Sequence, residues 1–353
     1  MSDVLVAILH QEPAAGSGPL TVATAAARRR CAERHRRGFL VAGARRVGIV
    51  SGPPDDRSFG ARLRDVVAGM REGGLVVLGS GAIPLATTAD RGELVAAAAA
   101  SRSGALTNNR YSGDVVAVAQ ARPTLAHVPD LATDNALPRW LAEVAGVPVE
   151  DRAGRRRLGI DIDGPLDLVL LGGRWTSLLR EQEVASVRVA LARVRSVIED
   201  PRAELLIAGR VSAANLAWLE ARTASRTRAL IEERGLRTSG ADQRPAASVL
   251  GALLERDGPD TFGTLLARFG DAAIVDTRVL LAHRLGTDED GWPTAEDRFA
   301  SDLMLHERIA DPWLRDLTQA ALAAPIPIVL GAHTLVGPGL TLALGRRGIG
   351  GRR

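Results

Sequence analysis

Four short segments rich in glycine, proline, serine or acidic residues follow apolar runs that are typical of buried strands. They are residues 10–18, 51–56, 79–84 and 161–163. In sheets of parallel strands, ligands bind outside the carboxyl ends of the strands, where such loops meet. We therefore expect these segments to line one ligand site.

A second polar constellation lies in residues 108–114, between two apolar runs. Arg110 could clamp a phosphate or a carboxylate, Asn108 and Asn109 could contact a base or a sugar, and Asp114 could supply a metal ligand. The same residue types also favour a hydrogen-bonded turn without a ligand. Both interpretations remain open at this stage.

The elements that must position these residues alternate between strand and helix. Apolar runs at residues 4–9, 46–52, 75–78 and 115–119 predict strands, and a further strand is expected to end at Ile160. Helices are expected at residues 21–40, 59–70, 93–100 and 137–145, the last with Asp134 or Asn135 as its N-cap. This alternation predicts an α/β fold with a mostly parallel sheet.

Three motifs in this order resemble those of MobA-like nucleotidyltransferases, which have the GT-A nucleotide-diphosphosugar transferase fold. They are Gly16-Ser17-Gly18 in the first loop, Gly79-Ser80-Gly81-Ala82-Ile83-Pro84-Leu85, and Asp161-Ile162-Asp163-Gly164-Pro165-Leu166-Asp167-Leu168. The resemblance covers roughly residues 1–172. It implies a GT-A or Rossmann-like domain there.

The resemblance also implies roles for individual residues. It implies nucleotide binding by Gly16, Ser17, Gly18, Gly79, Ser80, Gly81, Asn108 and Asn109, catalytic roles for Arg110 and Asp114, and Mg²⁺ binding by Asp161 or Asp163. Asp161 is the favoured ligand, because Asp163-Gly164-Pro165 also reads as the turn and cap of a helix starting near Leu166. The alternative is a helix-starting turn that binds no metal.

The chain departs from the family pattern at three positions. Ala82 stands where the family has a metal-binding aspartate, and the first loop lacks the usual arginine and lysine. The resemblance implies NTP-dependent transfer of a nucleotidyl group to a small phosphorylated or sugar-like acceptor. The departures favour the alternative, a non-catalytic nucleotide- or partner-binding module.

Composition narrows the classes of function. All 45 basic residues are arginine, which excludes Schiff-base chemistry and a P-loop lysine. The net charge is only +4 and the basic residues form no patch with interleaved aromatics, so a nucleic-acid partner is not expected. Cys31 is the single cysteine, which excludes an intrachain disulfide. The first apolar run is too short for a signal peptide or a membrane span, which predicts a cytoplasmic protein.

The second half predicts another α/β domain, at residues 201–353, reached through a linking helix at residues 173–200. It resembles no family that we recognise. Ser212 follows a predicted strand and reads either as an anion site or as a plain helix N-cap. If this domain closes over the first, Arg210, Arg278 or His333 could supply the positive charge that the first loop lacks. The alternative is a tethered, independent domain.

Overall fold

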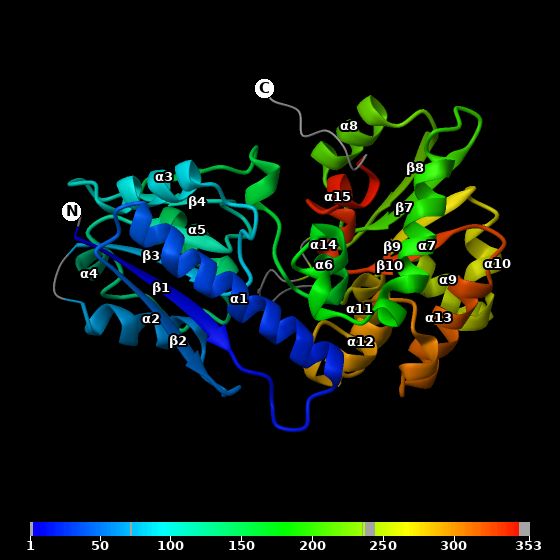
Figure 1. Ribbon diagram of the computed structural model, residues 1–353, viewed down its shortest axis with the longest axis horizontal. Helices are drawn as coiled ribbons and strands as arrows, with labels where there is room; N and C mark the ends of the chain where they lie inside the picture. Colours follow the sequence, from blue (N-terminus) through cyan, green and yellow to red (C-terminus); the bar gives the residue numbers. More distant parts are fainter. Residues whose placement is uncertain (1–2, 71–72, 235, 237–243, 346–353) are drawn as a thin grey trace. The chain divides into compact units, whose positions relative to one another are not determined.

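Buried apolar runs form the strands of two separate sheets. The computed structural model describes residues 3–70, 73–234, 236 and 244–345. Their contacts define two compact units, the first ending at Asp163 and the second beginning at Gly164, except that Gly18–Ala23 group with the second. Strands alternate with helices in both, which confirms the predicted α/β class with mostly parallel strands (Figure 1).

The described residues of the first unit contain strands β1 to β6 and helices α1 to α5. The strands are β1 (Val4–Gln11), β2 (Arg46–Gly52), β3 (Gly74–Gly79), β4 (Ala105–Thr107), β5 (Val115–Val118) and β6 (Val149–Asp151). The helices are α1 (Pro19–Val41), whose first residues group with the second unit, α2 (Phe59–Ala68), α3 (Thr88–Ala98), α4 (Ala121–Thr124), α5 (Leu137–Glu143) and, opening the second unit, α6 (Pro165–Leu171). Short 3₁₀ turns η1 (Asp134–Ala136) and η2 (Arg156–Leu158) interrupt the loops.

The first sheet has the strand order β2-β1-β3-β5-β4-β6. β1 is parallel to both β2 and β3, β4 is parallel to β6, and β5 runs antiparallel to its two neighbours. The chain leaves β1 to one side for β2 and returns to the other side for β3. This reversal makes the carboxyl ends of β1 and β3 the topological switch point of the sheet, the place where open α/β sheets bind ligands.

Successive residues of the strands pack alternately into two apolar clusters, one on each face of the sheet. Val6 and Ile8 of β1 face a cluster that includes Phe39 of α1 and Leu94 of α3. Ala7 of β1 faces the other cluster, which includes residues of α2 and α5. Because side chains alternate across a strand, a sheet buried on both faces needs continuous apolar strands, and β1 and β3 meet this requirement. The sheet edge that carries the polar loops is thus held rigidly from both faces.

The second unit contains a four-stranded sheet and the remaining helices. The strands are β7 (Glu204–Gly209), β8 (Arg226–Ile231), β9 (Ala272–Asp276) and β10 (Ile328–Gly331). The helices are α7 (Glu181–Val197), α8 (Ala213–Arg222), α9 (Val249–Asp257), α10 (Phe262–Leu266), α11 (Thr277–Leu285), α12 (Ala295–Asp302), α13 (Pro312–Ala323), α14 (His333–Val336) and α15 (Leu340–Leu344). The remaining 3₁₀ turns are η3 (Thr176–Leu178), η4 (Pro259–Thr261), η5 (Glu289–Gly291) and η6 (His306–Arg308).

All strands of the second sheet are parallel, in the order β10-β9-β7-β8. Its switch point lies between β7 and β9 and is occupied by two buried arginine–aspartate pairs. Arg210 Nε donates to Asp276 Oδ2 at 2.6 Å, and Arg278 Nη2 donates to Asp302 Oδ2 at 2.7 Å, with all four side chains buried. Gly209 permits this, since a Cβ there would lie 2.4 Å from the Cβ of Asp276.

The structure confirms the predicted cap at Ser212 and contradicts two other local predictions. Ser212 is the N-cap of α8 and accepts a hydrogen bond from Asn215 N, as the plain-cap interpretation expected. The N-cap prediction for Asp134 or Asn135 is wrong, because α5 begins after Ala136 without a side-chain cap. The strand expected to end at Ile160 is absent; residues 159–164 belong to no strand or helix. The predicted linking helix is α7, which packs against β9 and β10.

Replacing Gly209 with alanine should destabilise the protein strongly. Gly209 has a φ of +117°, and an added Cβ would meet Asp276, so G209A adds backbone strain and a clash, at a cost of more than about 2 kcal/mol. Gly48 in β2 has open space around its Cα and serves as the matched control. Thermal unfolding should show a lower midpoint for G209A and an unchanged one for G48A. Equal midpoints for the two variants would contradict this account of the switch point.

Candidate functional site

The switch point of the first sheet holds a buried histidine and serine. Nδ1 of His10, the seventh residue of β1, lies 3.0 Å from Oγ of Ser80, which follows β3. The two residues are 6% and 5% exposed, and Ser80 N donates to Leu9 O at 2.8 Å. Burial and the nearby Arg29 lower the pKa of His10, so its imidazole is neutral at pH 7.

Carboxylates surround the turn formed by Gly79, Ser80 and Gly81. A Cβ on Gly81 would lie 2.7 Å from Asp161 Oδ1, and a Cβ on Gly79 would lie 3.9 Å from Asp134 Oδ2. The backbone ties the segments together, since Ile162 N donates to Gly81 O at 3.2 Å and Gly79 N donates to Asp114 O at 3.4 Å. Gly81 therefore lets the segment that carries Asp161 approach the end of β3 closely, whereas the distance to Asp134 would also accommodate a side chain at position 79.

Asp114 enters the same cluster because β5 is antiparallel. The start of β5 lies beside the end of β3, which brings Asp114 to the carboxyl edge of the parallel strands. Asn108 is 3% exposed and orients this carboxylate, donating from Nδ2 to Asp114 Oδ2 at 2.8 Å and to Leu158 O at 2.9 Å. Its Oδ1 accepts from Asp114 N at 2.9 Å. Asn108 thus joins the β4–β5 loop to the segment that carries Asp161.

The electrostatics show that the negative charge of this cluster is only partly compensated, since Arg28 acts on Asp161 but does not offset the effects of burial and of the neighbouring carboxylates. Desolvation by burial, together with repulsion from Asp161 and Asp134, raises the pKa of Asp114 well above its ordinary value. Burial and the nearby Asp163 raise the pKa of Asp161 to about 7. Carboxylates that repel one another this way are neutralised either by protons or by a cation. Perturbed groups of this kind, placed at a switch point, mark a candidate functional site.

Arg28 of α1 is the cation that approaches the acidic segment. Its Nε donates to Ile162 O at 2.7 Å and its Nη2 donates to Asp163 O at 3.0 Å, and Nη2 lies 3.9 Å from Asp163 Oδ1. The predicted helix start at Asp163-Gly164-Pro165 is confirmed: Gly164 is the N-cap of α6, and Asp167 Oδ2 accepts from Gly164 N at 2.8 Å. Asp161 accepts a hydrogen bond from Ile162 N at 2.7 Å, and Arg28 lowers its pKa without offsetting the effects of burial and of Asp163.

Helix α1 also fixes the turn that follows Gly81. His35 Nε2 donates to Ala82 O at 2.8 Å, while its Nδ1 accepts from Arg91 Nε at 3.3 Å, and Arg34 donates to Pro84 O. Burial and the Arg91 charge lower the pKa of His35 to about 3, so the ring is neutral. Ile83 is buried with a φ of +43°, which is strained for a β-branched residue.

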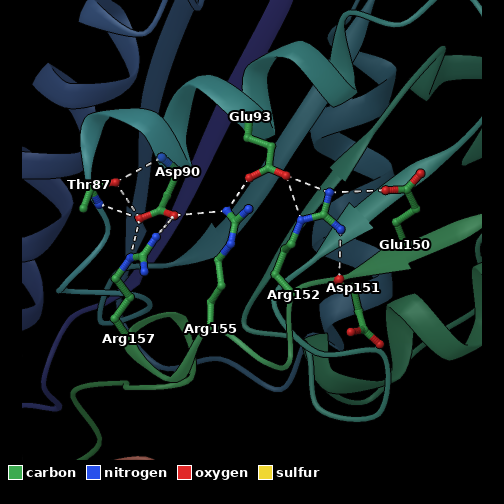
Figure 2. A network of polar contacts seen from close by, with 8 residues as sticks. All are labelled: Thr87, Asp90, Glu93, Glu150, Asp151, Arg152, Arg155 and Arg157. Carbon is green, nitrogen blue, oxygen red and sulfur yellow. Dashed lines mark hydrogen bonds and ion pairs between the residues drawn. The ribbon is translucent and has the colours of Figure 1, made fainter. Parts of the chain in front are cut away.

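A network of acidic side chains and arginines holds residues 150–157 against α3. Figure 2 shows its members: Thr87, Asp90, Glu93, Glu150, Asp151, Arg152, Arg155 and Arg157. Asp90 is 2% exposed and accepts from Arg157 Nη2 at 2.6 Å and from Thr87 N at 2.8 Å. Burial alone would raise the pKa of Asp90, but these hydrogen bonds hold it well below its usual range. Glu93 accepts from Arg152 Nε at 2.7 Å. The network sets the path of residues 150–157 toward Asp161.

The predicted residues divide into those that the first unit brings together and those that it does not. Brought together are Gly79, Ser80, Gly81, Asn108, Asp114, Asp161 and Asp163. Asn109 shapes the loop, because its Oδ1 accepts from Tyr111 N. Arg110 has a buried Nε that finds no hydrogen-bond partner among the described residues. Gly16 and Ser17 belong to the first unit and Gly18 to the second.

The N-terminus of α1 already holds a carboxylate. Glu296 of α12 accepts from Leu20 N at 3.1 Å and from Thr21 N at 3.0 Å, and a Cβ on Gly18 would lie 2.3 Å from its Cδ. A helix N-terminus is suited to an anion, and here the anion is a side chain of the protein. A phosphate bound to the same N–H groups would have to displace Glu296.

Arg210 and Arg278 of the second unit are committed to ion pairs within that unit. Arg210 and Arg278 neutralise Asp276 and Asp302, and His333 acts electrostatically on Asp276. Burial alone would raise the pKa of Asp276, but Arg210 lowers it below its ordinary value. Removing Arg210 or Arg278 from these pairs would leave a buried charge uncompensated. Their charge is therefore not available to a ligand elsewhere, contrary to the expectation from the sequence.

Sequence reasoning missed Asp134 and His35 as parts of the site. His10 opens a segment that the sequence analysis expected to line the site, but it was given no role there. Asp134 was interpreted as a helix cap, and its approach to Gly79 depends on a loop path that no local pattern encodes. His35 lies in the middle of a long helix, where a single histidine carries no signal.

Metal binding by protein ligands alone finds no support in the geometry. Across the parts of the chain that the structure describes, no three His, Cys, Asp or Glu side chains are arranged to hold a metal ion. Mg²⁺ usually takes one or two carboxylates and completes its shell with waters and substrate phosphates. Asp161 with Asp114 fits that requirement in number and chemistry.

Comparison with known proteins identifies no family for this chain, so the function has to be inferred from the geometry of the site. No family model matches the sequence, and no curated protein shows significant similarity to it. No helix among the described residues is long and apolar enough to cross a membrane.

Alanine at position 81 should disturb the site, whereas alanine at position 79 should not. A Cβ on Gly81 would collide with Asp161 Oδ1 and with Ile162 O at 2.9 Å, a backbone atom that cannot swing away. We expect G81A to lower stability by about 1–3 kcal/mol. In G79A the nearest atom is 3.9 Å away, so stability should hold. Urea unfolding of both variants measures the difference, and equal losses would show that the carboxylate segment does not approach Gly81.

Replacing Asp161 with asparagine should stabilise the metal-free protein at high pH. Because the pKa of Asp161 is raised to about 7 by folding, the folded state binds more protons than the unfolded chain between the ordinary aspartate value and pH 7. Wild-type stability therefore falls as pH rises through this window. D161N should gain on the order of 4 kcal/mol over wild type above pH 7 and nothing below the ordinary aspartate pKa.

The matched control for this experiment is Asp130, an exposed carboxylate whose pKa Arg64 lowers. D130N should show no gain at high pH. Thermal unfolding in the presence of a chelator, from acid to pH 8, measures both variants. A D161N gain that does not vary with pH would contradict the proposed electrostatics.

Proposed function

We propose that the first unit binds a nucleoside triphosphate together with Mg²⁺ and transfers its nucleotidyl group to a small phosphorylated or sugar-like acceptor. The observation that carries the proposal is the pair of buried carboxylates with raised pKa values, Asp114 and Asp161, held around Gly79-Ser80-Gly81 at the carboxyl edge of the sheet. The resemblance of these segments to MobA-like nucleotidyltransferases adds to it.

Asp161 would be the main ligand of the cation and Asp114 its partner. Mg²⁺ bound there would neutralise phosphate charge and orient the reacting groups. The protein's own contribution is to position these groups. Asn108 orients Asp114, and side chains of α1 fix the turn that lies against Asp161. A rigid, preorganised arrangement of this kind lowers the cost of holding the reactants in line.

Other side chains at this edge supply the remaining contacts. Arg110 offers a donor that lacks a partner within the described protein, which suits a phosphate or carboxylate of the acceptor. Ser80 and the neutral His10 lie at the switch point and offer hydrogen bonds to the nucleotide. In the transfer, an acceptor oxygen forms a bond to the α-phosphorus as the bond to pyrophosphate breaks.

A binding module without catalysis is the second candidate, and two observations favour it. Ala82 is 1% exposed within an apolar cluster, so the family's aspartate has no counterpart there. Glu296 occupies the N–H groups that begin α1. In this case the same site would bind a nucleotide and release no pyrophosphate. Either activity would take place in the cytoplasm, the location expected from the sequence.

Nucleotide binding should depend on Mg²⁺ and on Asp161. We expect the full-length protein to be stabilised thermally by at least one of the four NTPs with Mg²⁺, and D161N to weaken that binding at least tenfold, since it removes the charge that attracts the cation. D130N is the control, because Asp130 is exposed and outside the cluster. Calorimetric titration gives the affinities.

Two outcomes would count against the proposal. Absence of stabilisation by every NTP with Mg²⁺ would remove nucleotide binding altogether, and equal affinities of D161N and D130N would remove Asp161 from the site. Pyrophosphate release with NTP and a pool of phosphorylated and sugar acceptors then distinguishes the transferase from the binding module.

A further inference from the structure

The second unit contains a cavity that none of the preceding assignments uses. It has a volume of about 310 Å³ and lies among residues of α9, α11 and α13. Its described lining combines apolar groups with charges of both signs: Leu254, Glu255, Leu280, His283, Arg284 and Trp313. The volume is at the lower end of the range for small-molecule sites.

His283 presents an unused donor in the wall of this cavity. Its Nδ1 accepts a hydrogen bond from Ser248 N at 3.2 Å, so the ring hydrogen is on Nε2. Nε2 is buried and makes no hydrogen bond within the described part of the chain, although Glu255 Oε2 lies 3.4 Å away. A Cβ on Gly251 would fall 2.2 Å from Cδ2 of this ring, so the glycine makes room for it.

The opposite charges of the cavity lie on neighbouring helices. Arg284 follows His283 on α11 and stacks over the Trp313 ring, with its Cζ 5.2 Å from the ring centroid. Glu255 on α9 lies 3.4 Å from His283 Nε2, and its side chain is 58% exposed, so it is accessible to a ligand. Leu254, Leu280 and Trp313 add the apolar surface.

We propose that this cavity binds an α-amino acid with an apolar side chain. The ligand's carboxylate would accept from His283 Nε2 and Arg284, its ammonium group would donate to Glu255, and its side chain would pack against Leu254, Leu280 and Trp313. The buried N–H of His283 then gains the acceptor that it lacks, which recovers the cost of leaving it unsatisfied.

A ligand with only one charge fits the cavity less well. A simple carboxylate would meet Arg284 but also the negative charge of Glu255, and a simple amine would meet Glu255 but also Arg284. Like charges at such distances oppose binding, whereas a zwitterion satisfies both groups at once. The requirement for two charges is therefore the distinguishing property of this site.

The test is calorimetric titration of the full-length protein with three probes: leucine, 4-methylpentanoate, which lacks the ammonium group, and 3-methylbutylamine, which lacks the carboxylate. We expect leucine to bind and each analogue to bind at least tenfold more weakly. E255Q should weaken leucine binding at least tenfold and should reduce its preference over 4-methylpentanoate. E220Q, on an exposed residue of α8 outside the cavity, should bind like wild type.

The other outcomes overturn the proposal. They are no binding of leucine at millimolar concentration, an analogue that binds as tightly as leucine, or an E255Q variant with unchanged affinity and selectivity. Because Glu255 is largely exposed, its replacement leaves the fold intact, and thermal unfolding of E255Q verifies this.

Discussion

The carbonyl oxygen of Ala82 is buried in the first unit and accepts its hydrogen bond from His35 of α1 at 2.8 Å. This hydrogen bond stabilises the strained turn at Ile83. The turn places Gly81 against the segment around Asp161. A neutral imidazole is required, and burial beside Arg91 keeps it neutral by lowering its pKa to about 3. Arg28 and Arg34 on the same helix hold the adjoining carbonyls. One helix therefore fixes both segments of the site.

The cost of this arrangement is the proximity of carboxylates. The arginines of the unit are placed around the cluster rather than within it, with Arg157 bound to Asp90 and Arg28 bound chiefly to backbone oxygens. The charges of Asp114 and Asp161 are only partly compensated by Arg28, which is unfavourable for folding but favourable for a cation that arrives with its own phosphates. In the second unit the acidic side chain at the switch point, Asp276, is instead neutralised by an ion pair with Arg210.

Much of the fold followed from apolar runs and turn chemistry. The strands β1, β2, β3 and β5 and the Ser212 cap lie where the sequence predicts them. The long-range contacts could not be predicted, because they depend on how distant segments meet: Asp134 approaches Gly79, and Glu296 reaches the start of α1. The antiparallel direction of β5, which brings Asp114 to the site, is likewise invisible in its four apolar residues. The segment after residue 158 has the apolar alternation of a strand, but Arg28 and Gly81 bind its backbone in place of a neighbouring strand.

The central claim is that Asp114 and Asp161 form one acidic pair awaiting a cation. Carbon-13 NMR of the aspartate carboxyl groups, followed from pH 4 to pH 9 and assigned with the asparagine variants, tests it most directly. Without metal, the account predicts that the two groups titrate together with the pKa of Asp161 near 7, and that Mg²⁺ with a bound NTP moves both titrations well below that value. Independent titration of the two groups at the ordinary aspartate value would contradict it.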